Sequence, residues 1–188
     1  MRLIDVMCRS LLATVFVVAA LSKIAGRPAW LGFVQSLREL NQVPDAAVRP
    51  AAITTVTTEA LVVVLLLVPS PTAGMVGSAI AAGLLAAFVV VIGLAIARGN
   101  RTPCRCFGTS NVPLGWPHVV RNLVLIGVAG LGLLSASAAG TTPAATVLLA
   151  GAGGLVAGIL ITAAEDIVAL VRPAGPPRPT SVSRRASR

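Results

Sequence analysis

The residues best suited to chemistry in this sequence are two cysteines, Cys104 and Cys106, with a single arginine between them. They lie in the stretch 103–108 (PCRCFG), a polar interval between two long apolar runs. A disulfide needs Cα atoms about 4.4 to 6.8 Å apart, and cysteines this close in sequence reach that separation only in a tight, strained turn. Strained, exposed disulfides are easily reduced and are typically catalytic or regulatory. The spacing therefore favours a thiol–disulfide centre.

Positive charge around the pair supports the same interpretation. Arg105 lies between the two cysteines and Arg101 shortly precedes them. Neighbouring cations favour the thiolate, which is the reactive form of cysteine. The candidate catalytic residues are therefore Cys104 and Cys106, with Arg105 in support.

Two other interpretations of the pair stay open at this point. The two thiols can be unreactive, or they can be ligands of a metal ion with His118 as a third ligand. Zinc sites usually have four ligands at wider spacing, whereas this chain holds one histidine and one further cysteine, Cys8. We therefore predict no metal site. Cys8 stands alone on a predicted helix, where packing is its expected role.

The composition indicates that the chain is a membrane protein. Of its 188 residues, 56% are hydrophobic and 11% are charged, whereas soluble domains are nearer 25% charged. Several apolar runs reach the roughly 18 to 20 residues that cross a bilayer as a helix. The basic residues, which give a net charge of +9, lie in loops and in a tail, as is common in membrane proteins. We therefore expect membrane lipid and no nucleic acid as a partner.

The predicted fold is an all-α bundle in the cell membrane, multi-pass, with residues 1–171 as one domain and 172–188 as a disordered tail rich in Arg, Pro and Ser. Five spans are expected, at about 4–22, 51–68, 74–97, 117–139 and 144–161, with residue 171 as an alternative end of the last span. Gly154 and Gly158 place small residues on one face of the last span, which suits close helix packing.

A short amphipathic helix is predicted between the first two spans, at 27–40. Its length is insufficient to cross a bilayer, so we expect it to lie at the interface. The residues that share its apolar face are Trp30, Phe33, Leu37 and Leu40, and those opposite are Gln35, Arg38 and Glu39.

One acid, Glu59, lies well inside an apolar span. An ionisable residue at such a position is a functional candidate, because burying it without a partner is costly. Its role is either a structural ion pair or a proton-handling, site-shaping one. We expect it to pair with Lys23 or Arg121.

Counting spans places the polar residues at one end of the bundle. The loops that follow the first and third spans lie on the same membrane face, which brings together Lys23, the cysteine stretch, Arg121 and Asn122. Cys8 belongs to the opposite end and is not expected to pair with either loop cysteine.

These residues together resemble the MauE family, methylamine-utilisation membrane proteins related to DoxX. The resemblance covers about residues 5–140, and its most specific part is C-x-C-F-G followed by R-N. The matching positions are Ser22, Lys23, Phe33, Pro44, Glu59, Arg98, Gly99, Cys104, Arg105, Cys106, Phe107, Gly108, Arg121 and Asn122.

The resemblance implies a role in maturing disulfide-containing proteins, such as the small subunit of methylamine dehydrogenase, together with a thioredoxin-like partner. It also implies likeness to four-helix thiol oxidoreductases that pass electrons to a membrane quinone. This chain has no second shuttle pair of cysteines, so no cofactor is predicted and a quinone has no support. The alternatives are a non-enzymatic membrane scaffold for a redox partner and a small-solute transporter that uses Glu59.

The charges and the implied role predict opposite orientations. Arg2 and Arg9 lie toward one face, and every other Lys and Arg lies toward the cysteine face or in the tail. The positive-inside rule therefore predicts a cytoplasmic cysteine loop. Disulfide formation requires the oxidising side of the membrane, and a cytoplasmic dithiol would instead relay reducing equivalents.

Overall fold

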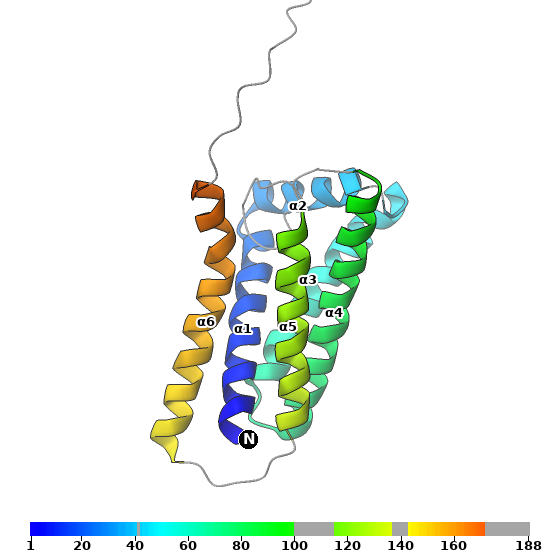
Figure 1. The fold of residues 1–188 in the computed structure, drawn as a ribbon. Helices are drawn as coiled ribbons and strands as arrows, with labels where there is room; N and C mark the ends of the chain where they lie inside the picture. Colours follow the sequence, from blue (N-terminus) through cyan, green and yellow to red (C-terminus); the bar gives the residue numbers. More distant parts are fainter. Residues whose placement is uncertain (41, 100–114, 137–142, 172–188) are drawn as a thin grey trace, which may run out of the picture.

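The computed structural model describes residues 1–40, 42–99, 115–136 and 143–171, with side chains described as far as Ala164. These ranges fold as six helices and contain no strand (Figure 1). The helices are α1 (Arg2–Ile24), α2 (Arg27–Leu40), α3 (Asp45–Leu67), α4 (Pro71–Ala97), α5 (Trp116–Ser135) and α6 (Ala144–Val171). All but α2 are long and apolar enough to cross a membrane. The predicted all-α fold with five spans is confirmed.

The short helix α2 lies across one end of the bundle, and the N-terminus lies at the other end (Figure 1). Its apolar face packs on α3, where Phe33 and Val34 contact Val48 and Ala52 in a small buried cluster. The residues expected on its polar face, Gln35, Arg38 and Glu39, are exposed. The predicted amphipathic helix therefore has the expected bounds and orientation.

Two helices begin earlier than the sequence suggested. α3 starts at Asp45 rather than near residue 51 and runs through Pro50. The extra turn forms because Val48, which is almost fully buried, packs against α2. α4 starts at Pro71 rather than Gly74, since proline suits the first turn of a helix, where a backbone N–H has no helical partner.

The other helix boundaries differ from the predicted ones by a few residues, and two of them border residues outside the described ranges. α1 extends two residues beyond the expected span at each end. α5 ends at Ser135 rather than near residue 139, and residues 137–142 lie outside the described ranges. α6 reaches Val171, the farther of the two predicted ends. The predicted disordered tail, 172–188, also lies outside the described residues.

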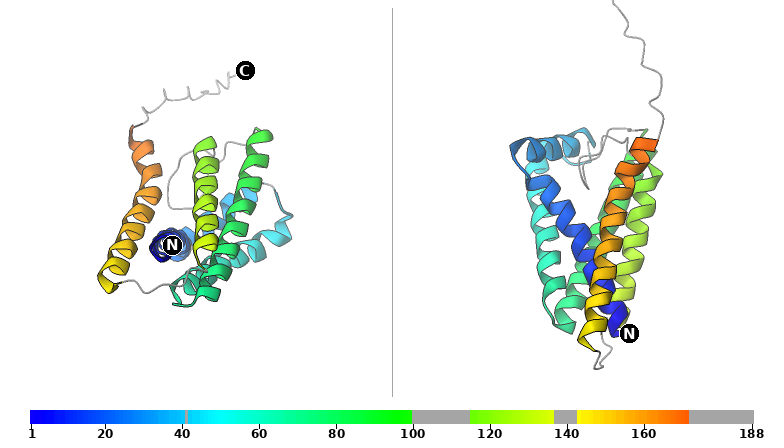
Figure 2. Two further views of the ribbon diagram at one scale, coloured as in Figure 1. Left: turned by 60° about the horizontal axis from the view of Figure 1, so that its bottom comes forward. Right: turned by 90° about the vertical axis from the view of Figure 1, so that its left-hand side faces the viewer.

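Helix α1 forms the centre of the bundle and contacts α3, α5 and α6 (Figure 2). Its side chains Leu12, Val15 and Phe16 have no exposed surface. They join Leu85 of α4 and Leu125 of α5 in one apolar core. Any residue on the inner face of α1 is therefore held by several helices at once.

Helix α6 packs principally on α1 through its glycines. A Cβ atom at Gly158 would lie 2.8 Å from Thr14 Cβ and 2.9 Å from the Leu11 carbonyl oxygen. A Cβ at Gly154 would overlap the Met7 carbonyl oxygen. The predicted small-residue face is therefore a contact in which the two backbones approach closely.

We expect Gly154→Ala to weaken the docking of α6 by about 1–3 kcal/mol, the usual cost of adding a methyl group to a filled contact. The matched control is Gly153→Ala, because a Cβ at Gly153 meets nothing within 4 Å. Unfolding of the purified protein by SDS titration measures the difference. Equal stability of the two variants would contradict this packing.

Candidate functional site

The two fully buried charged side chains of the described residues, Lys23 and Glu59, form an ion pair. Lys23 lies in the last turn of α1 and Glu59 in the middle of α3. The Lys23 Nζ lies 2.7 Å from Glu59 Oε1 and 3.0 Å from Glu59 Oε2. Their side chains are 1% and 0% exposed. Of the two partners predicted for Glu59, the structure selects Lys23.

The groups around the pair supply hydrogen-bond acceptors to the Lys23 ammonium. Lys23 Nζ also donates to the Ala19 carbonyl oxygen at 3.1 Å, so its three N–H donors meet three acceptors. It lies 5.2 Å from the centre of the Phe33 ring, within the range of a cation–π contact. A buried ion pair is tolerated only with such complete satisfaction. Because Phe33 belongs to α2, the pair joins three helices.

Helix α5 brings further polar residues to the same end of the bundle. Arg121, in the second turn of α5, is half-buried. Asn122 has no exposed surface, and His118 is 6% exposed. Within the described ranges, neither polar atom of the Asn122 side-chain amide has a hydrogen-bond partner. The predicted contact of Glu59 with Lys23 is thus observed, whereas the two loop cysteines, which were predicted to gather at the same place, lie outside the described residues.

The candidate catalytic residues Cys104 and Cys106, with Arg105, lie outside the described residues. The helices that flank them are placed: α4 ends at Ala97 and α5 begins at Trp116, both at the end of the bundle that carries α2 (Figure 1). Among the described residues, no three His, Cys, Asp or Glu side chains gather as a metal site would require. The chemistry of the pair stays a prediction.

The remaining cysteine, Cys8, is a free thiol in the N-terminal half of α1 and is 4% exposed. It precedes Lys23 by fifteen positions, which corresponds to roughly 22 Å along a helix. A Cβ atom added at Gly132 of α5 would lie 3.6 Å from the Cys8 Cβ. Cys8 is therefore a packed residue at the far end of the bundle, as predicted.

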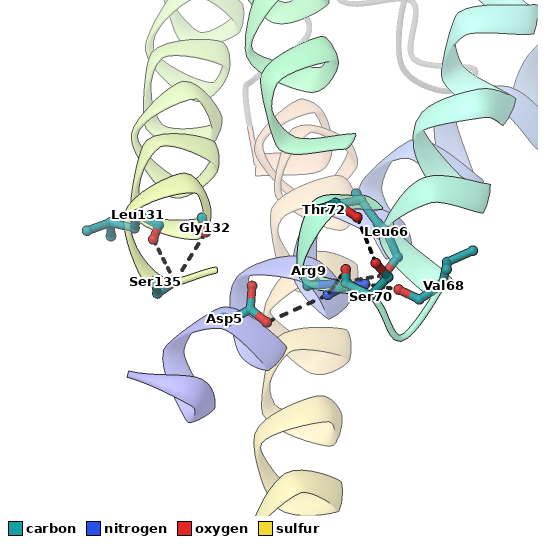
Figure 3. A network of polar contacts seen from close by, with 9 residues as sticks. All are labelled: Asp5, Arg9, Leu66, Val68, Ser70, Thr72, Leu131, Gly132 and Ser135. Carbon is teal, nitrogen blue, oxygen red and sulfur yellow. Dashed lines mark hydrogen bonds and ion pairs between the residues drawn. The ribbon is translucent and has the colours of Figure 1, made fainter. Parts of the chain in front are cut away.

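Sequence reasoning missed a second polar network, at the far end from Lys23 (Figure 3). Arg9 forms an ion pair with Asp5, one turn earlier on α1, with its Nη1 3.7 Å from Asp5 Oδ2. It also donates from Nε to the Leu66 carbonyl at 3.0 Å, from Nη1 to the Ser70 carbonyl at 3.3 Å, and from Nη2 to the Val68 carbonyl. Through these hydrogen bonds Arg9 joins α1 to the end of α3 and to the turn into α4, and it supplies a donor to the Leu66 carbonyl in the last turn of α3. The i, i+4 spacing alone could not reveal them.

The chain is similar in sequence to known proteins over most of its length. The sequence profile of the family described as "Methylamine utilisation protein MauE" matches residues 1–135, which include α1 to α5. The methylamine utilization protein MauE of Paracoccus denitrificans is 39% identical over 149 residues, which cover 77% of this chain and 77% of the relative. No solved structure matches the chain.

Proposed function

Because the chain belongs to the family of methylamine utilisation protein MauE, we propose that it is a membrane thiol–disulfide protein that supports the maturation of disulfide-containing partners in methylamine utilisation. The reacting groups are Cys104 and Cys106. The partners are a disulfide-containing client and a thioredoxin-like protein that returns the cysteine pair to its starting redox state.

The observation that supports this proposal is the place of the buried polar residues. α4 ends and α5 begins at the same end of the bundle as the buried pair of Lys23 and Glu59, and the sequence between these two helices holds both cysteines. Charged groups buried in a membrane protein commonly mark its functional region. At the other end, the turn between α3 and α4 is short, and Arg9 donates hydrogen bonds to backbone carbonyls at the end of α3 and in this turn.

The exchange itself needs only the two thiols and a partner disulfide. One loop cysteine, as the thiolate, attacks a sulfur of the partner, so the partner's S–S bond breaks, a mixed disulfide forms and a partner thiolate leaves. The second loop cysteine then attacks its neighbour's sulfur, which releases the other partner thiolate and closes the Cys104–Cys106 bridge. The partner gains two electrons and two protons, and the loop loses them. Run in reverse, the same steps oxidise a reduced partner.

The other predicted site residues act as positioning and electrostatic groups. Lys23 and Glu59 hold α1, α2 and α3 in register through their ion pair. Arg105 favours the thiolate form of its neighbours. Asn122 presents a buried side-chain amide at the start of α5, next in sequence to Arg121.

Maleimide labelling in isolated membranes tests the proposal. We expect Cys104 and Cys106 to label only after reduction, because the oxidised pair forms an easily reduced bridge. Cys8→Ser is the matched control, and it should leave the labelling pattern unchanged because Cys8 is buried at the far end. If both loop thiols label fully under oxidising conditions, the pair forms no bridge and a non-enzymatic scaffold explains the family membership better.

A further inference from the structure

Three arginines that have no acidic partner lie at the end of the bundle that carries α2. Arg27 begins α2, Arg49 lies near the start of α3, and Arg98 is the C-cap of α4. All three are exposed, and no acid among the described residues pairs with them. Arg98 donates to a neutral group, the Gln42 Oε1 at 2.9 Å. This end of the bundle therefore presents positive charge to its surroundings.

The opposite end presents much less positive charge. The cationic side chains described there are Arg2 and Arg9, and Arg9 is bound to Asp5 and to backbone carbonyls. The turn between α3 and α4 has no charged residue, and neither has the sequence between α5 and α6. By contrast, the sequence between α4 and α5 adds Arg101 and Arg105. Five more arginines follow α6, which ends on the side of α2 (Figure 1).

The two tryptophans of the chain place the end that carries α2 at a membrane surface. Trp30 lies on α2, and Trp116, at the start of α5, is 69% exposed. Tryptophan is enriched where the hydrocarbon core meets the lipid headgroups. Because α2 lies across the ends of the spanning helices (Figure 1), the exposed arginines of this end lie at the level of the headgroups or beyond it.

Arginines at that level distinguish the two sides of a membrane. Cytoplasmic segments of membrane proteins carry an excess of Lys and Arg, and acidic residues have little weight in this rule. The anionic lipids of the cytoplasmic leaflet attract such cations. The buried ion pair of Lys23 and Glu59 does not contribute to this attraction, because neither charge is exposed. The arginines without an acidic partner therefore favour the cytoplasmic side for the end that carries α2.

We propose that the end of the bundle that carries α2 faces the cytoplasm, and that the pair Cys104 and Cys106 therefore acts as a reductant that keeps the cysteines of its client reduced. The second part rests on the proposed function, whereas the orientation does not. The cytoplasm keeps thiols reduced through thioredoxin and glutathione. The client is thus met before it reaches an oxidising compartment, where its final disulfides form.

The electrons of this reaction balance on one face of the membrane. The dithiol of Cys104 and Cys106 reduces a client disulfide, so the client gains two electrons and two protons and the pair closes its bridge. A reduced dithiol protein of the cytoplasm then reduces the bridge and is itself oxidised to a disulfide. The third cysteine, Cys8, is single and buried, so this chain has no second pair to carry electrons across the bilayer.

The orientation is tested in the full chain with the three native cysteines replaced by serine. Gln35→Cys on α2 and Thr72→Cys in the first turn of α4 place one exposed thiol at each end of the bundle. A maleimide that does not cross the membrane is added to intact and to permeabilised cells. We expect Gln35→Cys to gain label severalfold on permeabilisation and Thr72→Cys to label equally in both. The opposite pattern, or full labelling of both thiols in intact cells, would overturn the proposal.

A second measurement separates the reductant role from the orientation. The redox state of Cys104 and Cys106 in the wild-type chain is trapped by alkylation in living cells. We expect the pair to be reduced in normal cells and oxidised in cells that lack the reductase of their cytoplasmic thioredoxin. A pair that is oxidised in both strains would overturn the reductant role while leaving an oxidising exchange. Thiols that form no bridge in the reductase-deficient cells would instead contradict the proposed function, and the orientation would stand on the labelling alone.

Discussion

Replacing Glu59 with glutamine is expected to lower the free energy of unfolding by about 3–5 kcal/mol, because it leaves the Lys23 ammonium buried beside a neutral amide. Lys23→Met should cost a similar amount, since it leaves the Glu59 carboxylate buried without its cation. Neither charge can reach water, as both side chains are at most 1% exposed. SDS titration of the purified protein measures both losses.

A matched ion pair at the surface provides the control. Arg38 Nε lies 2.9 Å from Asp45 Oδ1, but these side chains are 51% and 82% exposed. Arg38→Met should therefore cost less than about 1 kcal/mol. The double variant Lys23→Met/Glu59→Leu should recover most of the single-variant losses, because it removes both charges at once. Single-variant losses no larger than that of Arg38→Met would contradict a structural role for the buried pair.

The sequence predicted those features that depend on local pattern. Apolar run lengths gave the five spans, and the spacing of Trp30, Phe33, Leu37 and Leu40 gave α2 with its bounds. The cost of burying Glu59 predicted a cation beside it, and span counting reduced the candidates to Lys23 and Arg121. Lys23 is the cation that Glu59 meets because α1, which carries Lys23, is a neighbour of α3, which carries Glu59.

The remaining features depend on how separate helices meet. The carbonyls that Arg9 binds come from residues 57 to 61 positions away, and no local signal marks them. The early start of α3 follows from the packing of Val48 on α2. Each of these requires tertiary contacts that neither composition nor periodicity encodes.

Replacing one loop cysteine is expected to stop the exchange halfway. Cys104→Ser and Cys106→Ser each leave a single thiol in the loop, so the variant that keeps the attacking cysteine forms the mixed disulfide but cannot resolve it. This variant should accumulate a covalent complex with its partner, whereas the wild type resolves it. The double variant Cys104→Ser/Cys106→Ser should form none, and Cys8→Ser should behave like the wild type because Cys8 is buried.

Mass spectrometry of that complex, after non-reducing purification from cells, tests the thiol–disulfide mechanism most directly. We expect one of the two single-serine variants to yield a loop peptide joined by a disulfide to a cysteine peptide of a thioredoxin-like protein or of a client, and we expect reductant to release it. If neither variant forms a reducible adduct, and the double variant still matures the client's disulfides, the thiol–disulfide mechanism is wrong.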